Sequence, residues 1–179
     1  EKPFRLRIAQ RCGAPECDFD LTVVQGICAP EKMDAIVAAA TEIGASRIVP
    51  LTCVRGAQID RRHVDETSKR WRDTARRVAM LSGQPSSPIV EDPINMHDAG
   101  YGLSTRDCVL VCYEQASAQS IGDALDACAK SLDVSRNALK AAVVVGPEGG
   151  FEQHEIDRLL SSNDHTSLVS LGPSILRVE

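Results

Sequence analysis

Two Gly-Pro motifs are the parts of this sequence best suited to hold a ligand. The first is "VVVGPEGGF" at residues 143–151, and the second is "SLGPSILR" at residues 170–177. In each motif an apolar run stops abruptly on glycine and proline. Proline fixes φ and glycine permits close approach to the backbone, so two such loops can form rigid walls around one ligand. A Gly-Pro pair can also simply end a strand, and the pattern alone leaves that alternative open.

The residue types of the first motif restrict the chemistry of the ligand. The motif matches neither G-x-G-x-x-G nor the phosphate-binding pattern G-x-x-x-x-G-K-[ST]. Glu148 would repel a pyrophosphate, and no lysine follows it to neutralise one. A dinucleotide or a nucleoside triphosphate is therefore disfavoured, and a nucleoside that lacks phosphates and carries a positive charge fits better. S-adenosylmethionine has both properties.

A basic segment at residues 61–77 ("RRHVDETSKRWRDTARR") points to a second kind of partner. This segment carries a net charge of +4, although the whole chain carries −5. Such a concentration of charge on an acidic protein indicates a surface that faces a polyanion. The candidates for phosphate contacts are Arg70, Arg72, Arg76 and Arg77. For each of them a solvated helix face is the alternative, and Trp71 is expected in the core.

The elements that must position these motifs alternate between strand and helix. Apolar runs predict strands at 19–25, 47–51, 107–114, 139–146 and 166–172, and an extended segment at 87–93. Helical periodicity predicts helices at 30–44, 61–83, 120–132 and 151–162. This alternation is typical of an α/β fold, a parallel sheet with helices on both faces. Ligands of such sheets bind beyond the carboxyl ends of the strands, where both Gly-Pro motifs lie.

Composition argues against a membrane-spanning protein, a disulfide-rich protein and a zinc protein. The 179 residues are 43% hydrophobic and 25% charged, which is ordinary for a globular domain, and no apolar run is long enough for a membrane helix. Most of the seven cysteines lie in apolar segments, which favours reduced thiols and a cytoplasmic location over disulfides. Cys12 and Cys17 have no second Cys/His pair to complete a zinc site, so we expect no bound metal.

Several segments together resemble one known family. "VVVGPEGGFEQHEI" followed by "SLGPSILRVE" resembles the C-terminal signature of the small-subunit (16S) ribosomal RNA uridine-N3 methyltransferases, which belong to the SPOUT superfamily. "KMDAIVAAATEIGASRIVPLTCVRG" and "KRWRDTARRVA" resemble two further segments of that family. The resemblance covers roughly residues 21–179.

The resemblance implies a fold and a domain division. Residues 21–179 would form the SPOUT methyltransferase domain, whose C-terminal segment passes through a trefoil knot. Residues 1–20 would be a remnant of an N-terminal β-barrel, a PUA-like RNA-binding domain. Members of the family are homodimers that bind S-adenosylmethionine in the knot, so the expected partners are small-subunit ribosomal RNA or the 30S subunit and a second copy of the chain.

The resemblance also implies site residues. One wall of the cofactor site would be formed by Gly146, Pro147, Glu148, Gly149 and Gly150. The other would be formed by Leu171, Gly172, Ile175 and Leu176. Tyr113 and Glu114 would border the same pocket, unless Glu114 caps the next helix. Arg177 would hold a phosphate or the developing uracil anion as the catalytic residue, unless it only pairs with Glu179. Glu148 would organise the cofactor loop rather than act as a base.

Three positions depart from the family pattern. Leu81 and Gln84 replace the glutamine and arginine of a Q-S-x-R motif, and Ala39 replaces a common lysine. We expect these positions to face RNA or substrate, so the departures favour a non-catalytic RNA-binding or ribosome-assembly protein. The complete Gly-Pro motifs, in contrast, favour an active methyltransferase. A third hypothesis, a flavodoxin-like domain that binds a phosphorylated ligand, is opposed by Glu148.

Overall fold

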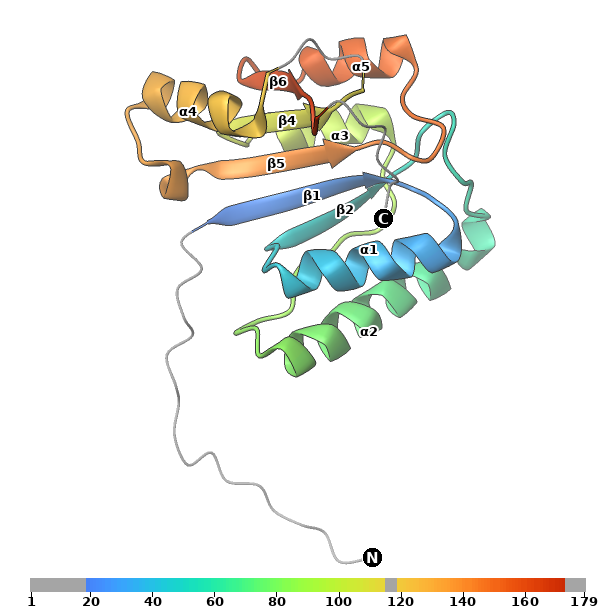
Figure 1. Ribbon diagram of the computed structural model, residues 1–179. Coiled ribbons are helices and arrows are strands. Elements are labelled where there is room, and N and C mark those ends of the chain that lie inside the picture. The colour runs from blue at the N-terminus through green and yellow to red at the C-terminus, as the bar shows by residue number, and fades with distance from the viewer. Residues whose placement is uncertain (1–18, 115–118, 173–179) are drawn as a thin grey trace, which may run out of the picture.

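A six-stranded parallel sheet forms the centre of the computed structural model, which describes residues 19–114 and 119–172 (Figure 1). The strand order is β3-β2-β1-β5-β4-β6, and every neighbouring pair is parallel. Strand β1 therefore lies at the centre, beside β5, although more than a hundred residues separate the two. The strands are β1 (Asp20–Gly26), β2 (Arg47–Leu51), β3 (Ile89–Val90), β4 (Cys108–Cys112), β5 (Lys140–Val145) and β6 (Thr166–Val169).

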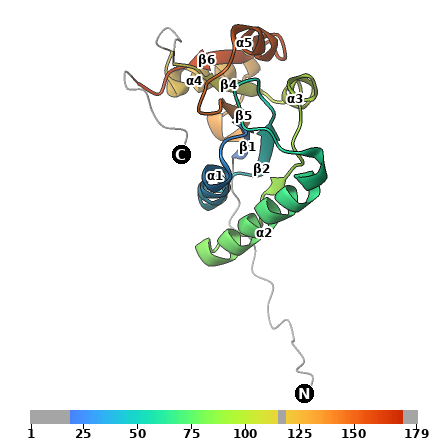
Figure 2. The ribbon, with the colours of Figure 1, turned by 90° about the vertical axis from the view of Figure 1, so that its right-hand side faces the viewer.

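Helices cover both faces of the sheet. One face packs against α1 (Pro30–Glu42), α2 (Val64–Ser82) and α4 (Ile121–Leu132). The other face packs against α3 (Met96–Leu103) and α5 (Gln153–Leu160). In Figure 2, α3 and α4 lie on opposite sides of the strands. Short 3₁₀ helices precede α2 (Arg61–His63) and β5 (Arg136–Ala138). The predicted α/β fold, a parallel sheet with helices on both faces, is confirmed.

The apolar strands and the basic helix have the burial that their sequences predict. Strand β5 reads "KAAVVV" without alternation because helices cover both of its faces. Trp71 is 1% exposed and packs between the sheet and α1, as its helical register indicated. Helix α2 ends at Gly83, which has φ of 69°, a left-handed conformation that favours glycine.

One helix was missed, and two strands end two or more residues earlier than predicted. Residues 96–103 form helix α3, which we did not predict, because Gly100 and Gly102 lower the helix propensity of the segment. The missed signal was Asn95, whose side chain accepts hydrogen bonds from the N–H groups of His97 and Asp98 at the start of the helix. Strand β4 ends at Cys112, two residues before the predicted end, so Tyr113 and Glu114 lie beyond the strand. Strand β6 ends at Val169, three residues before the predicted end at Gly172.

Some predictions fall on residues that the structure does not describe. The barrel remnant, except for its last two residues, and both zinc-candidate cysteines lie within residues 1–18. The end of the chain that would form the trefoil knot lies within residues 173–179. Among the described residues, no helix is both long and apolar enough to cross a membrane.

Candidate functional site

The loop after β5, residues 146–152, lies against the end of β1. Gln25, 2% exposed, donates hydrogen bonds from Nε2 to the carbonyl oxygens of Gly146 (3.2 Å) and Gly26 (2.9 Å). A Cβ at Gly26 would lie 2.5 Å from the backbone nitrogen of Pro147, so only glycine fits there. Strand β1 and the first Gly-Pro motif are therefore in direct backbone contact.

The Glu148 carboxylate ties this loop to the beginning of α1. Its Oε1 accepts a hydrogen bond from the backbone N–H of Ala29 (3.3 Å) and lies 3.5 Å from Nζ of Lys32. The pKa of Glu148 is lowered, first by its own backbone N–H and then by Ala29, Cys28 and Lys32. An ionised carboxylate held in this way is a poor proton acceptor, so these contacts support the organising role over the role of a base.

Helix α5 ties the same loop to the segment after β2. Glu155, 2% exposed, accepts hydrogen bonds from the backbone N–H groups of Val54 (3.0 Å) and Glu152 (2.9 Å). Glu152 and Glu155 also form a capping box at the start of α5. Sequence reasoning missed Glu155, although the three-residue spacing of the two glutamates is the signature of that motif.

The two glycines of the first motif are required for different reasons. A Cβ at Gly149 would lie 2.8 Å from Cβ of Arg55, so a side chain there would push the β2 segment away. Gly150 has φ of 69°, and its N–H donates to the carbonyl oxygen of Pro147 (2.8 Å) in a tight turn. Among the residues that the structure describes, none has a heavy atom within 4 Å of the position where a Cβ of Gly150 would stand.

The second loop begins where β6 ends, at Ser170. Its Oγ accepts a hydrogen bond from Gly172 (3.2 Å), and its N–H donates to Gln119 (3.1 Å). Gly172 has φ of 118°, and no other described residue has an atom within 4 Å of where its Cβ would stand. Leu171 is 53% exposed. Ile175, Leu176 and Arg177 lie outside the described residues.

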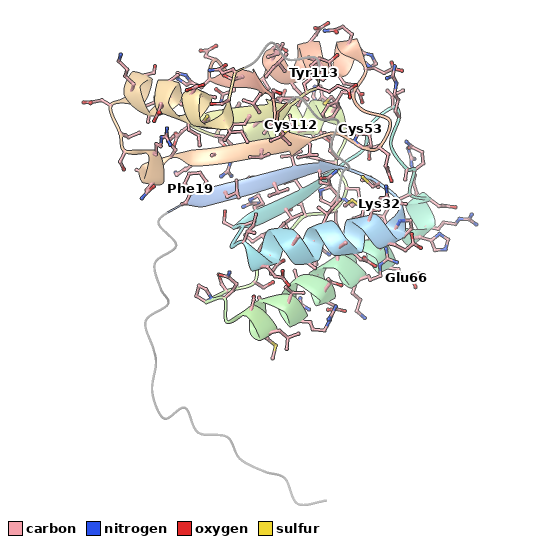
Figure 3. The ribbon with its side chains drawn as sticks, in the orientation of Figure 1. Phe19, Lys32, Cys53, Glu66, Cys112 and Tyr113 are labelled. Atoms are coloured by element: carbon pink, nitrogen blue, oxygen red, sulfur yellow. The ribbon has the colours of Figure 1, made fainter. Side chains whose placement is uncertain are left out.

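Strand β4 separates the two loops, because it lies between β5 and β6. The N–H of Tyr113 donates to Val169 (3.1 Å), which places Tyr113 and Glu114 between the loops at the same edge of the sheet. Figure 3 shows Tyr113, Cys53 and Lys32 at this carboxyl edge, whereas Phe19 marks the opposite edge. The alternative role of Glu114 as a helix cap is wrong, because Ser120 caps α4 through the N–H of Asp123.

The carboxyl edge offers backbone groups and apolar surface rather than a nucleophile. Burial raises the pKa of the Cys28 and Cys53 thiols to about 12, and the charges of Glu148 and Glu155, respectively, add to the effect. Both thiols are therefore protonated at neutral pH. Within residues 19–114 and 119–172, no three His, Cys, Asp or Glu side chains are grouped so as to hold a metal ion.

The four predicted phosphate-binding arginines differ in their surroundings. Arg72 donates from Nε to Val90 (2.9 Å) and pairs with Asp92 (2.7 Å), so it fastens α2 to β3. Arg70 pairs with Asp34 (3.2 Å), and Arg76 pairs with Asp73 (2.9 Å). Arg77 is exposed and forms no ion pair with any described residue. Arg72 is thus the poorest RNA-binding candidate of the four, and Arg77 is the best.

A cavity at the amino ends of the strands was not predicted. It measures about 330 Å³ and lies over β1 and β2 beside α3. Its lining includes the apolar side chains of Val24, Val49 and Leu103. Three of its lining residues take part in ion pairs, since Arg47 pairs with Glu91, and Arg106 pairs with Asp20 (3.2 Å). The cavity shares no lining residue with the Gly-Pro loops.

The three departures from the family pattern lie away from the Gly-Pro loops. Gln84, just after α2, donates from Nε2 to the carbonyl oxygen of Glu42 (2.8 Å) at the end of α1. Leu81 is 78% exposed in the last turn of α2, and Ala39 is exposed in the last turn of α1. Both helices begin beside the carboxyl edge and end at the amino edge, so in this chain the departures do not reach the loops.

Comparisons with known proteins agree with this geometry. A family model described as RNA methyltransferase domain matches residues 15–179. A Mycobacterium bovis protein named Ribosomal RNA small subunit methyltransferase E is 30% identical over 179 residues, covering 97% of this chain and 64% of that protein. A Bacillus subtilis protein of the same name is 28% identical over 165 residues, covering 92% of this chain and 62% of that protein.

A solved structure has the same fold. Ribosomal RNA small subunit methyltransferase E from Neisseria gonorrhoeae, bound to S-adenosyl methionine, superposes with a TM-score of 0.75 at 21% identity, covering 96% of this chain and 64% of that chain. The chain thus spans less than two thirds of the length of these relatives. The resemblance inferred from the Gly-Pro motifs is confirmed at the level of the family.

Proposed function

From the premise that the chain belongs to the RNA methyltransferase domain family, we propose that it transfers a methyl group from S-adenosylmethionine to N3 of a uridine in small-subunit (16S) ribosomal RNA. The observation that carries this proposal is the pair of glycine loops at one edge of the sheet. Gly150 and Gly172 both have positive φ, and no atom of the other described residues lies within 4 Å of where their Cβ atoms would stand. The two glycines lie on either side of Tyr113, because β4 lies between β5 and β6.

The described residues fit S-adenosylmethionine as the cofactor. Residues 146–150 and 171–172 would hold the adenosine and methionine parts mainly through backbone groups, with Tyr113 and Glu114 between them. Ile175 and Leu176 would complete the second wall. When bound, the cofactor supplies the electrophilic methyl group. Glu148, whose charge is compensated by Lys32 and the start of α1, would organise the first loop rather than act as a base.

The protein must activate the uridine for methyl transfer, because N3 is a poor nucleophile until its proton leaves. The site must hold N3 in line with the methyl group and stabilise the anion that forms. We assign this role to Arg177. The base edge is hidden in paired RNA, so the target is expected to be unpaired or flipped out of its helix.

The basic segment around α2 is the proposed RNA-facing surface, with Arg70, Arg76 and Arg77 contacting phosphates. Homodimerisation, the trefoil knot and a cytoplasmic location belong to the same proposal, since they accompany the family resemblance.

The second candidate function is that of a non-catalytic RNA-binding or ribosome-assembly protein on the same scaffold. Ala39, Leu81 and Gln84 favour it, because they replace a lysine, a glutamine and an arginine of the family pattern, which removes two positive charges and the amide at position 81.

A methylation assay separates the two candidates. Labelled S-adenosylmethionine is incubated with the protein and with small subunits from a strain that lacks the modification, and the labelled nucleoside is then identified. Label in 3-methyluridine that disappears in Arg177→Ala is the expected result. Cofactor binding without any transfer to RNA would instead support the non-catalytic candidate.

A further inference from the structure

We propose that Arg55 contacts a phosphate of the bound RNA beside the target nucleotide, an inference that rests on the proposed function. Arg55 lies in the segment between β2 and α2, directly against the first Gly-Pro loop. Its Nη1 donates to the carbonyl oxygen of Gly149 (3.4 Å), and its Nε lies 3.6 Å from Oε1 of Glu152. A cation is thereby fixed at the wall that would hold the cofactor.

The guanidinium of Arg55 keeps donors for another partner. Its side chain is 54% exposed, and the two described contacts use Nε and one hydrogen of Nη1. The second hydrogen of Nη1 and both hydrogens of Nη2 are left to form a two-pronged contact with an anion. Phosphate oxygens match this fork geometry, and water-exposed guanidinium groups bind them readily.

The segment that carries Arg55 is held firmly in place. The N–H of Val54 donates to the buried carboxylate of Glu155 (3.0 Å), and the N–H of Ala57 donates to Ile27 (2.8 Å). A Cβ at Gly56 would lie 2.9 Å from the carbonyl oxygen of Ile27. These contacts pre-orient the guanidinium, so little conformational entropy is lost when an anion binds.

The position of Arg55 connects the two proposed surfaces. A few residues after it, the chain enters the basic segment at Arg61, which begins beside the same carboxyl edge. An RNA strand that crosses α2 toward the glycine loops would therefore pass Arg55 last. This places Arg55 at a phosphate next to the reacting nucleotide, whereas the α2 arginines contact phosphates farther along the strand.

The test measures RNA binding and methyl transfer in the same variants. A 16S ribosomal RNA fragment that contains the target is titrated at several salt concentrations, and S-adenosylmethionine binding is measured separately. For Arg55→Ala we expect an RNA KM about 10-fold higher and a salt-dependence slope lower in magnitude by about 1, as for one lost phosphate contact. We expect cofactor affinity within about twofold of the wild type, and partial rescue by Arg55→Lys.

Two further variants distinguish RNA contact from a structural role. Glu152→Gln breaks the pair with Arg55 but keeps the cation, so its salt slope should equal that of the wild type. Arg136→Ala removes another paired, exposed arginine at the amino edge and should change neither slope nor KM. Equal effects of Arg55→Ala and Glu152→Gln on cofactor affinity, with an unchanged slope, would overturn the inference. A wild type that neither binds nor methylates the RNA would overturn the proposed function and this inference with it.

Discussion

The carboxyl edge and the amino edge of the sheet differ in how closely their neighbouring segments pack. At the carboxyl edge, glycines allow close contact between the loops that follow β1, β2 and β5. The carboxylates of Glu155 and Glu148 hold these loops together. At the amino edge, a cavity of about 330 Å³ remains, and ion pairs such as Arg106–Asp20 span its surroundings. Large apolar side chains such as Leu81 are exposed there.

This difference shows where the sequence is constrained. Gly26 and Gly149 face protein atoms at less than 3.0 Å, so no other residue fits without movement of the loops. The departures at Leu81 and Gln84 occur where neighbouring atoms leave room. Substitutions of these two glycines should therefore be costly for folding and cofactor binding, whereas substitutions at exposed positions of the amino edge should be mild.

The largest effect is expected for Gly26→Ala. The added Cβ would collide with backbone atoms of Gly146 and Pro147, which cannot move like a flexible side chain. We expect a loss of about 3 kcal/mol in the free energy of unfolding, measured by urea denaturation, with cofactor affinity at least tenfold weaker. The matched control is Gly102→Ala in α3, where no atom lies within 4 Å and the helix should gain stability. Equal effects of the two substitutions would contradict the account.

A smaller loss is expected for Glu155→Ala. This change leaves the N–H groups of Val54 and Glu152 without their carboxylate acceptor in a buried position. The free energy of unfolding should fall by about 2 kcal/mol, and the Gly-Pro loop should separate from the β2 segment. Glu155→Gln, which keeps one acceptor oxygen, should lose about half as much. Hydrogen exchange at the Val54 amide measures the separation directly, and unchanged protection in Glu155→Ala would refute it.

The Glu148 carboxylate should contribute in a pH-dependent way. Its folded-state pKa is below the ordinary value of 4.5, so its stabilising contacts are present at neutral pH. They are lost as the pH falls through the lowered folded-state pKa. The difference in unfolding free energy between the wild type and Glu148→Gln should therefore shrink as the pH falls below about 4.5. Glu31→Gln, in the first turn of the same helix, should show a smaller difference at neutral pH. A difference that grows on acidification would have the wrong sign.

The smallest effect is expected at the amino edge. Leu81→Gln combined with Gln84→Arg restores the family pattern at two positions that the Gly-Pro loops do not touch. Stability should change by no more than about 0.5 kcal/mol at the exposed Leu81. It should change by no more than about 1 kcal/mol at Gln84, which loses its hydrogen bond to Glu42. Cofactor affinity should stay within about twofold. Isothermal titration with S-adenosylmethionine measures this. A large gain in affinity would mean that these positions act on the cofactor site after all.

Sequence periodicity was sufficient for most of the fold. The continuous apolar run of β5 and the helical spacing of α2 reflect burial, which leaves a direct pattern in the sequence. Helix α3 escaped prediction because its stability comes from packing against the sheet and from the Asn95 cap, and its two glycines hide that pattern.

The site was predictable only in part. The Gly-Pro motifs revealed where the loops are, since glycine and proline report backbone conformation locally. The contacts by which Gln25, Arg55 and Glu155 join separate loops were missed because these partners lie about a hundred residues away, and no local pattern encodes such contacts. The capping box of Glu155 with Glu152 is local and could have been recognised. For the same reason, the acidic partners Asp34 and Asp92 of the basic helix could not be read from its own sequence.

The most direct test of the account is a map of amide chemical-shift changes on titration with S-adenosylmethionine. We expect the largest chemical-shift changes at residues 26–29, 53–56, 146–152 and 170–172, and at Tyr113 between the loops. The amides of Thr22, Arg47 and Arg106 around the amino-edge cavity should stay unchanged. Changes confined to that cavity would contradict the claim that the interlocked carboxyl-edge loops hold the cofactor.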